Sequence, residues 1–180
     1  FKLLSSHMKV HISELNNQVY IDPLTSVENK GAFSNYLAHL QERMDADPER
    51  LHFAVGVFDC DNLKMINDLY GHDKGDLYLK NACQLICKIF KSSPVFRIGG
   101  DEFSVIMQNN DYNNREELTE KFKAAMKATA VVSTNSWDQV HVAMGLATYD
   151  PMTDPAVIDV VRRADKYMYA NKRASKKASS

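Results

Sequence analysis

The sequence predicts a single α/β domain with a mixed central β-sheet of about five strands flanked by helices. Short apolar, β-branched segments alternate with longer segments of helical periodicity, which is typical of interleaved strands and helices. Two of the apolar segments flank a glycine turn, which predicts a β-hairpin and therefore antiparallel pairing within the sheet. The length, 180 residues, suits one domain with a short appendage.

The composition is that of an ordinary globular domain. Apolar residues make up 44% and charged residues 25% of the chain, enough to bury one sizeable core. The 22 basic and 23 acidic residues give a net charge of −1, so we expect no nucleic-acid partner from overall charge. No apolar run approaches the roughly 20 residues that cross a bilayer, so we expect a soluble domain without a membrane segment.

The cysteines indicate a reducing compartment. Three cysteines are too few for a disulfide framework, and no C-x-x-C pair suggests a zinc site, so we expect a cytoplasmic location for the domain. Because the sequence starts at Phe1, we expect an excised piece of a longer protein, whose full-length form can be membrane-attached.

The first element is a helix at the amino-terminal end. Apolar residues recur there at three-to-four-residue intervals, and Asp22-Pro23 ends the pattern because a proline disfavours helix in the residue before it. We interpret residues 1–21 as a linker or signalling helix and residues 22–180 as the domain itself. The alternative is a helix packed on its own domain.

Helices and one buried strand follow. A helix is predicted to start near Glu28, and the apolar segment Leu51–Phe58 reads as a strand that ends at Asp59. The periodicity then predicts helices over Asn62–Leu69 and Asp76–Phe90.

The second half contains the hairpin. Its strands are Val95–Ile98 and Phe103–Met107, on either side of Gly99–Glu102. The remaining expected elements are a helix over Asn114–Ala130, a short strand beginning at Val131–Val132, a strand over Val140–Ala147 and a helix over Pro155–Lys172.

The hairpin turn carries a candidate site. Two glycines at a turn are explained by conformational freedom alone, but Asp101 and Glu102 directly after them are not. Adjacent carboxylates on a stiff turn repel each other unless a cation or a proton lies nearby. Glycines at positions 99 and 100 also let a ligand approach the backbone closely. We therefore predict a functional carboxylate site here.

Asp59 extends this candidate site. It lies where a buried strand runs out, and if that strand neighbours the hairpin, Asp59 converges with Asp101 and Glu102. Carboxylates from two segments suit Mg²⁺, which completes its shell with phosphates and water. The helix that opens after Asp59 offers free N–H groups to an anion. The combination indicates a nucleoside triphosphate site.

Several motifs in a fixed order carry a resemblance to the diguanylate cyclase (GGDEF) family. Residues 97–103, Arg-Ile-Gly-Gly-Asp-Glu-Phe, contain the signature that gives the family its name. The other motifs are the opening one at Asp22–Asn29, the long central one at Asp59–Asp76, the late strand at Ala143–Ala147 and the closing helix at Ala164–Lys172. The resemblance runs from Asp22 to Lys176, and it implies a nucleotidyl-cyclase, palm-like fold.

The resemblance also implies a reaction. Two GTP molecules condense into cyclic di-3′,5′-guanylate and release two pyrophosphates, each 3′-hydroxyl attacking the α-phosphate of the other nucleotide. Asp59 and Asp101 map to ligands of Mg²⁺ or Mn²⁺, joined by the carbonyl of Cys60 and by Glu102. Glu102 maps to the residue that helps to deprotonate the 3′-hydroxyl. The implied catalytic residues are Glu102, Asp101 and Asp59.

The substrate contacts follow from the same resemblance. Asn67 and Asp76 map to the pair that reads guanine, and a carboxylate accepts from the N1–H and amino groups that adenine lacks, so Asp76 favours GTP over ATP. His72 is expected to border this pocket. The expected phosphate contacts are Asn62, Leu63, Lys64, Gly99, Gly100, Lys172 and Lys176. Without the resemblance, the two terminal lysines read as a solvated basic helix end.

The resemblance implies a homodimer as well. One domain holds one GTP and the product has two-fold symmetry, so two domains must meet face to face. An upstream sensory domain is expected to precede this chain. The alternative from another class is a catalytically silent module that binds GTP and regulates a fused or partner domain. A cyclase with relaxed base choice is disfavoured by Asp76.

The sequence departs from the family pattern in two places that bear on function. The product-inhibition motif R-x-x-D is missing, because Phe90-Lys91-Ser92-Ser93 occupies its register. We therefore predict weak or absent product feedback. Lys176 stands where arginine is common, which keeps the charge but loses bidentate geometry.

Overall fold

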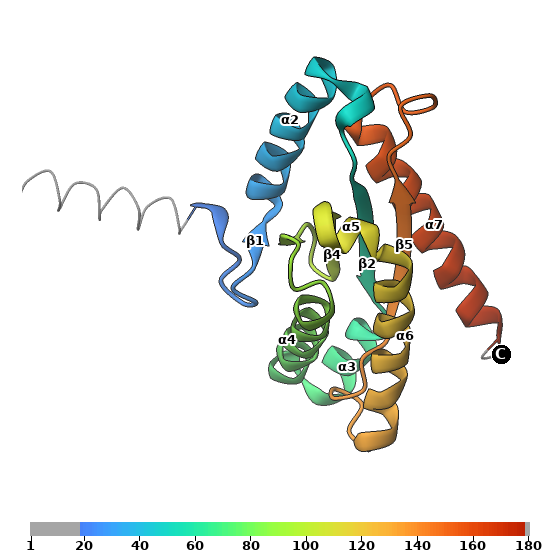
Figure 1. Cartoon of the computed structure of the whole chain (residues 1–180). Helices are drawn as coiled ribbons and strands as arrows, with labels where there is room; N and C mark the ends of the chain where they lie inside the picture. The colour runs from blue at the N-terminus through green and yellow to red at the C-terminus, as the bar shows by residue number, and fades with distance from the viewer. Residues whose placement is uncertain (1–18, 179–180) are drawn as a thin grey trace, which may run out of the picture.

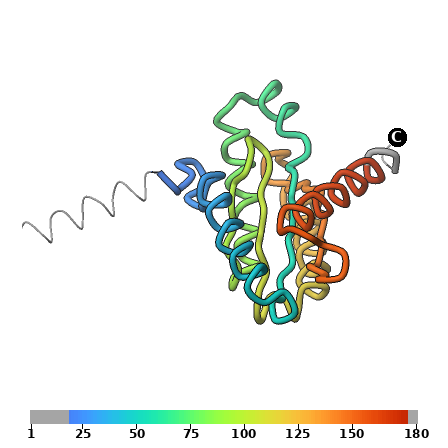
Figure 2. Tube along the Cα trace, turned by 90° about the horizontal axis from the view of Figure 1, so that it is seen from above, coloured from blue at the N-terminus to red at the C-terminus, as the bar shows by residue number. Residues whose placement is uncertain are grey.

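A computed structural model of the chain describes residues 19–178, with side chains as far as Ser175. It is a three-layer arrangement in which helices cover both faces of one sheet (Figures 1 and 2). The predicted α/β class with a five-stranded mixed sheet is confirmed. The linker helix predicted for residues 1–21 lies almost wholly outside the described residues, which include only its last positions.

The sheet has the order β1-β3-β4-β2-β5, with β1 parallel to β3 and every other pair antiparallel. Strand β2, which lies between β4 and β5, is buried along its whole length, as expected of a strand covered on both faces. The strands are β1 (Glu28–Asn29), β2 (Ala54–Cys60), β3 (Val95–Arg97), β4 (Glu102–Met107) and β5 (Val142–Thr148).

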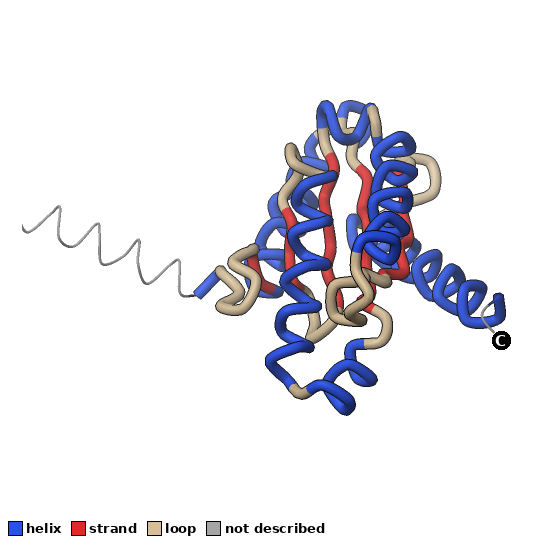
Figure 3. The backbone as a smooth tube through the Cα atoms, turned by 90° about the horizontal axis from the view of Figure 1, so that it is seen from below, coloured by secondary structure: helices blue, strands red, loops and turns tan. Residues whose placement is uncertain are grey.

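Helices pack on the two faces of this sheet in separate layers. Alternate residues of β2 point to opposite faces, so Phe58 contributes to one apolar cluster and Val57 to the other. The first face is covered by α3 (Leu63–Tyr70), α4 (His72–Ile89) and α6 (Arg115–Val132), and the second by α2 (Lys30–Ala46) and α7 (Val157–Ala178). The layers are visible in Figure 3. The short elements are η1 (Pro48–Arg50) and α5 (Asn109–Asn113).

The long last helix lies close to the sheet because of one glycine. A Cβ atom on Gly145 of β5 would lie 2.0 Å from the carbonyl oxygen of Ala164 and 2.2 Å from the amide nitrogen of Met168. Both atoms belong to the backbone of α7, so only a residue without a side chain permits this approach. Gly145 therefore sets the position of α7 over β5.

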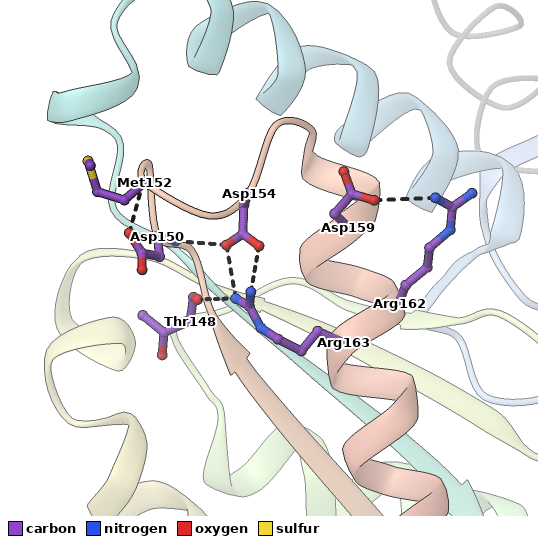
Figure 4. Close-up of polar contacts among 7 residues, drawn as sticks. All are labelled: Thr148, Asp150, Met152, Asp154, Asp159, Arg162 and Arg163. Atoms are coloured by element: carbon purple, nitrogen blue, oxygen red, sulfur yellow. Dashed lines mark hydrogen bonds and ion pairs between the residues drawn. The ribbon is translucent and has the colours of Figure 1, made fainter.

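The loop between β5 and α7 is fixed by an ion pair (Figure 4). Arg163 donates to both carboxylate oxygens of Asp154 and, at 2.5 Å, to the carbonyl of Thr148. Asp154 also accepts from the amide of Asp150. These bonds tie the start of α7 to the end of β5.

Several predicted boundaries are wrong. Val131 and Val132 end α6 instead of beginning a strand, and both are more than 80% exposed, so no sheet buries them. The fifth strand is instead the two-residue β1, which pairs with β3. Helix α4 starts at His72, because Gly71 with φ 86° lets the chain reverse directly after α3. None of the described helices is long and apolar enough to cross a membrane.

Candidate functional site

The site lies where β2 ends beside the hairpin. The pairing of β2 with β4 places Asp59 directly opposite Glu102, and cross-strand partners project from the same face of a sheet. Asp59 is 8% exposed and Glu102 is half-buried. The predicted convergence of these two segments is confirmed. Two boundaries differ, since Asp59 lies inside β2, which runs to Cys60, and Glu102 is the first residue of β4.

The hairpin turn is held against the end of β2 by backbone hydrogen bonds. The amide of Cys60 donates to the carbonyl of Asp101 at 2.8 Å, and the amide of Ile98 donates to the carbonyl of Glu102 at 2.9 Å. Asp101 therefore lies next to the Asp59–Cys60 segment, as the sequence predicts. The thiol of Cys60 is buried in the apolar cluster on the first face of the sheet, and burial raises its pKa.

The two turn glycines have different reasons to be glycine. Neither lies in the left-handed region, so conformational freedom does not explain them. A Cβ on Gly99 would lie 2.8 Å from Oε2 of Glu102, so the glycine leaves room for that carboxylate. Gly100 is exposed, with no atom within 4 Å of a Cβ there, and its backbone stands open to solvent.

A lysine from the last helix faces these carboxylates. Nζ of Lys172 lies 2.5 Å from Oδ1 of Asp59 and 3.5 Å from Oδ1 of Asp61. Burial opposes the charged form of Lys172, but the carboxylates of Asp59 and Asp61 outweigh it and raise its pKa. Lys172 thus lies beside the carboxylates of the candidate site, and its contact with phosphate stays a prediction. Lys176 lies outside the residues whose side chains are described.

Negative charge accumulates around Glu102. Burial raises the pKa of Glu102, and the carboxylates of Asp59, Asp101 and Asp165 raise it further, against the opposing effect of Lys172. Like charges at this density favour either a proton or a cation. Asp165 belongs to α7, and neither it nor Asp61 is among the site residues that the sequence motifs predict.

The opening motif is tied to the same turn. Asp22 accepts hydrogen bonds from the amide and hydroxyl of Thr25 and forms a 3.1 Å ion pair with Arg97. Arg97 also donates to the carbonyl of Gly100 at 2.7 Å. Burial opposes ionisation of Asp22, but the bonds from Thr25 and Arg97 outweigh it and lower its pKa. Asp22 and Arg97 thus support the turn from the side of the amino terminus.

The α3–α4 corner carries the predicted base-reading residues. A Cβ on Gly75 would lie 1.8 Å from Oδ1 of Asn67, so the amide of Asn67 rests directly on the first turn of α4. Gly75 precedes Asp76, and the exposed side chains of His72 and Asp76, four residues apart, lie on one face of α4. The structure therefore places Asn67, His72 and Asp76 at one corner.

The phosphate-binding positions predicted after β2 lie at the start of α3. Asn62 adopts a left-handed conformation with φ 68°, and its side chain makes no capping hydrogen bond. The first-turn amides, including that of Leu63, are consequently not capped by that side chain. Lys64 is exposed on the same turn. Among the side chains described, no three His, Cys, Asp or Glu residues converge tightly enough to hold a metal ion by themselves.

Comparison with known proteins identifies the family. The model of the family described as diguanylate cyclase, GGDEF domain, matches residues 19–178. The chain is 31% identical over 162 residues to the uncharacterized protein YhcK of Bacillus subtilis, covering 88% of this chain. It is 32% identical over 167 residues to the diguanylate cyclase TpbB of Pseudomonas aeruginosa, covering 91% of this chain. The chain belongs to the GGDEF domain family.

The fold of this GGDEF domain agrees with a solved structure. The coiled coil and GGDEF domain of DgcB from Caulobacter crescentus, crystallised in complex with c-di-GMP, superposes with a TM-score of 0.81 at 22% identity. The match covers 96% of this chain and 91% of that one. The chain spans only 44% of the length of YhcK and 38% of that of TpbB.

Proposed function

We propose that this GGDEF domain condenses two GTP molecules into cyclic di-3′,5′-guanylate and releases two pyrophosphates. One observation carries the proposal: the pairing of β2 with β4 sets Asp59 and Glu102 side by side on one face, with Asp101 bonded to the next residue of β2. Lys172 brings a positive charge to the same place. Four charged groups at one strand end suit the handling of a triphosphate.

Guanine recognition is assigned to the α3–α4 corner. The carboxylate of Asp76 accepts from the N1–H and amino groups of guanine, while the amide of Asn67 pairs with another base edge. The contact of Asn67 with Gly75 supports this assignment, because it sets the amide against the residue that precedes Asp76. Adenine lacks these donors, so it forgoes the charge-assisted hydrogen bonds that guanine makes with the carboxylate. His72 borders the base.

The triphosphate is assigned to the start of α3 and the end of α7. The amides of Asn62 and Leu63 lie at the start of α3, and the amino terminus of a helix favours anions. Lys64 and Lys172 neutralise the phosphate oxygens, and Lys176 extends the clamp. The open backbone at Gly100 allows the phosphates to approach the hairpin turn.

Proton removal is assigned to Glu102. The 3′-hydroxyl must lose a proton as it attacks the α-phosphate, and a base acts best when its pKa approaches the working pH. In the metal-free site, burial and three neighbouring carboxylates raise the pKa of Glu102 in that direction. The proton then resides on a carboxylate oxygen of Glu102, for which Gly99 leaves room.

The donor set fits Mg²⁺ or Mn²⁺. Carboxylate and carbonyl oxygens are hard ligands, and Asp59, Asp101 and Glu102 bring several negative charges to one strand end, which favours a bound cation. Asp59, Asp101, Glu102 and the carbonyl of Cys60 are the residues that would hold the ion. When bound, such an ion neutralises the phosphates and stabilises attacking and leaving oxygens.

Two domains are required for turnover in this proposal. A single domain offers one base-reading corner, whereas the product contains two guanines related by a two-fold axis. We therefore assign the active form to a homodimer in which the two sites face each other. At concentrations far below the dimer constant, the rate should vary with the square of protein concentration.

Product feedback through the hairpin-proximal segment is proposed to be weak. Phe90, in the register of the family's arginine, is fully buried and packs against the rings of Phe58 and Phe122. Ser93, in the register of the aspartate, donates its hydroxyl to Asp111 at 2.7 Å. These contacts support a segment built for packing, without the charges that would hold a guanine nucleotide.

Incubation of the domain with GTP and Mg²⁺, followed by chromatography of the nucleotides, tests the proposal. We expect cyclic product at high protein concentration, and none from Glu102→Gln or Asp59→Asn at unchanged thermal stability. Substantial product from either variant would show that the residue assignments are wrong. GTP bound without turnover by the wild-type chain would favour the alternative, a silent module that regulates a fused or partner domain.

A further inference from the structure

Tyr78 places a hydroxyl group inside the apolar interior beneath the site. It lies on the inner face of α4 with no exposed surface. A phenolic hydroxyl buried in this way needs hydrogen-bond partners, since burial without them is costly. The hydroxyl finds three: the carbonyl oxygen of Asp61 at 2.6 Å, the carbonyl oxygen of His141 at 2.8 Å and the amide of His141 at 3.1 Å.

These partners belong to two chain segments that meet at the site. Asp61 follows the end of β2, and His141 precedes the start of β5. The two segments also bond directly, since the amide of Asp61 donates to the carbonyl of His141 at 2.8 Å. The hydroxyl has one proton, so it accepts from the amide of His141 and donates to one of the two carbonyls at a time.

We propose that Tyr78 is a positioning residue for the loop between β2 and α3, which the proposed function assigns to the triphosphate. The loop contains Asn62 in its left-handed conformation, which starts α3. It also carries the carboxylate of Asp61, which faces Lys172. A bond to the carbonyl of Asp61 fixes both features from the interior side. The inference rests on the proposed function.

The aromatic ring and the hydroxyl have separable roles. The ring fills the interior cluster formed by α4, β2 and β5, as a phenylalanine would. Within the described part of the chain, the hydroxyl forms hydrogen bonds only with backbone atoms of Asp61 and His141. Removing the oxygen alone therefore loosens the loop while the core remains filled.

The chain offers a matched control in Tyr149. Its hydroxyl is also buried, but it has no hydrogen-bond partner within the described part of the chain, and its ring stacks on Phe53 at 5.0 Å. It follows β5 at the end opposite His141. Tyr149→Phe thus removes a buried hydroxyl without touching the loop.

The experiment compares Tyr78→Phe, Tyr149→Phe and the wild-type chain. Hydrogen exchange of the nucleotide-free protein should accelerate at the amides of Asp61 and His141 only in Tyr78→Phe. Calorimetry with GTP should show binding weakened by about two- to tenfold, the range expected for one lost hydrogen bond. Where turnover is measurable, KM for GTP should rise while kcat is retained.

The outcomes separate this inference from the proposed function. Unchanged loop exchange and unchanged GTP affinity in Tyr78→Phe would overturn the positioning role, as would a lowered kcat at constant KM. Wild-type protein that binds GTP without forming product would defeat the proposed activity alone, and the exchange and binding comparisons would still decide the role of Tyr78. Equal effects in Tyr149→Phe would also overturn the inference, because the loss would then be general.

Discussion

The contact between Asn67 and Gly75 allows folding to be separated from nucleotide recognition. In Gly75→Ala the new Cβ would lie 1.8 Å from Oδ1 of Asn67, whereas an ordinary contact begins at 3.4 Å. The amide must therefore move by about 1.6 Å, and it is the end of a flexible side chain. The variant should lose the position of Asn67 while keeping the backbone of both helices.

The expected effect on stability is small. Alanine is favoured over glycine within a helix by about 1 kcal/mol. Turning the side chain of Asn67 away from its preferred position costs about 0.5–1.5 kcal/mol. The two terms nearly cancel, so the melting temperature of Gly75→Ala should lie within about 4 °C of the wild-type value.

The expected effect on GTP binding is large. A base left without one of its buried partners loses about 1–3 kcal/mol, which is roughly fivefold to over a hundredfold in affinity. Calorimetry with GTP measures the loss, and Asn67→Ala should reproduce it. Gly75→Ala introduced into Asn67→Ala should cause no further loss of GTP affinity, because the side-chain oxygen that the new Cβ would meet is already absent. Wild-type affinity in Gly75→Ala would refute the assignment of Asn67.

Two further predictions concern stability. Gly145→Ala drives a Cβ into the backbone of α7, so we expect the free energy of unfolding to fall by about 3 kcal/mol and the melting temperature by roughly 6–12 °C. The control Gly100→Ala, whose Cβ meets no atom, should melt like the wild type. A shift under about 2 °C in Gly145→Ala would contradict this packing. Thr25 and Arg97 favour the ionised form of Asp22 in the folded state. The contribution of this carboxylate to the free energy of unfolding is therefore present above pH 3.8 and is lost as pH falls through the lowered pKa of Asp22. Urea unfolding should show Asp22→Asn less stable at pH 7, with the gap closing below pH 3.8; a gap that is constant with pH would rule out the ion pair as its source.

The elements that the sequence predicted well are those whose pattern reflects burial. The strand ending near Asp59 and the hairpin around Gly99 were predictable, because apolar runs bounded by turn residues have few other structures. The prediction of a strand at Val131–Val132 was wrong, because these two apolar residues are not buried. Two β-branched residues favour a strand locally. Here they lie on an exposed face of the chain with none of the described strands beside them, and they form the last residues of α6 instead.

The charged residues of the site were predictable from the sequence, but the hydrogen bonds that hold them in place were not. Carboxylates beside glycines stand out in a sequence, and Asn67 and Asp76 were predicted from the family's central motif. The contacts that fix these groups pass through backbone atoms, such as the carbonyl of Gly100 that accepts from Arg97. Tyr78 occupies an apolar helix position, so its pattern indicates core packing alone, and only the fold brings its hydroxyl to two loops.

The loops of the site are joined to each other as well as to the sheet, and this has a consequence for control. The hairpin turn bonds to β2 through Cys60, and the next residue, Asp61, bonds to the segment before β5. Arg97 links the turn to Asp22, near the amino-terminal end of the domain. A displacement of the chain at Asp22 would therefore reach the turn through one guanidinium, and from there the end of β2 through one amide. Asp22 and the end of β2 are thus connected by three direct contacts: the Asp22–Arg97 ion pair, the bond from Arg97 to the carbonyl of Gly100, and the bond from the amide of Cys60 to the carbonyl of Asp101.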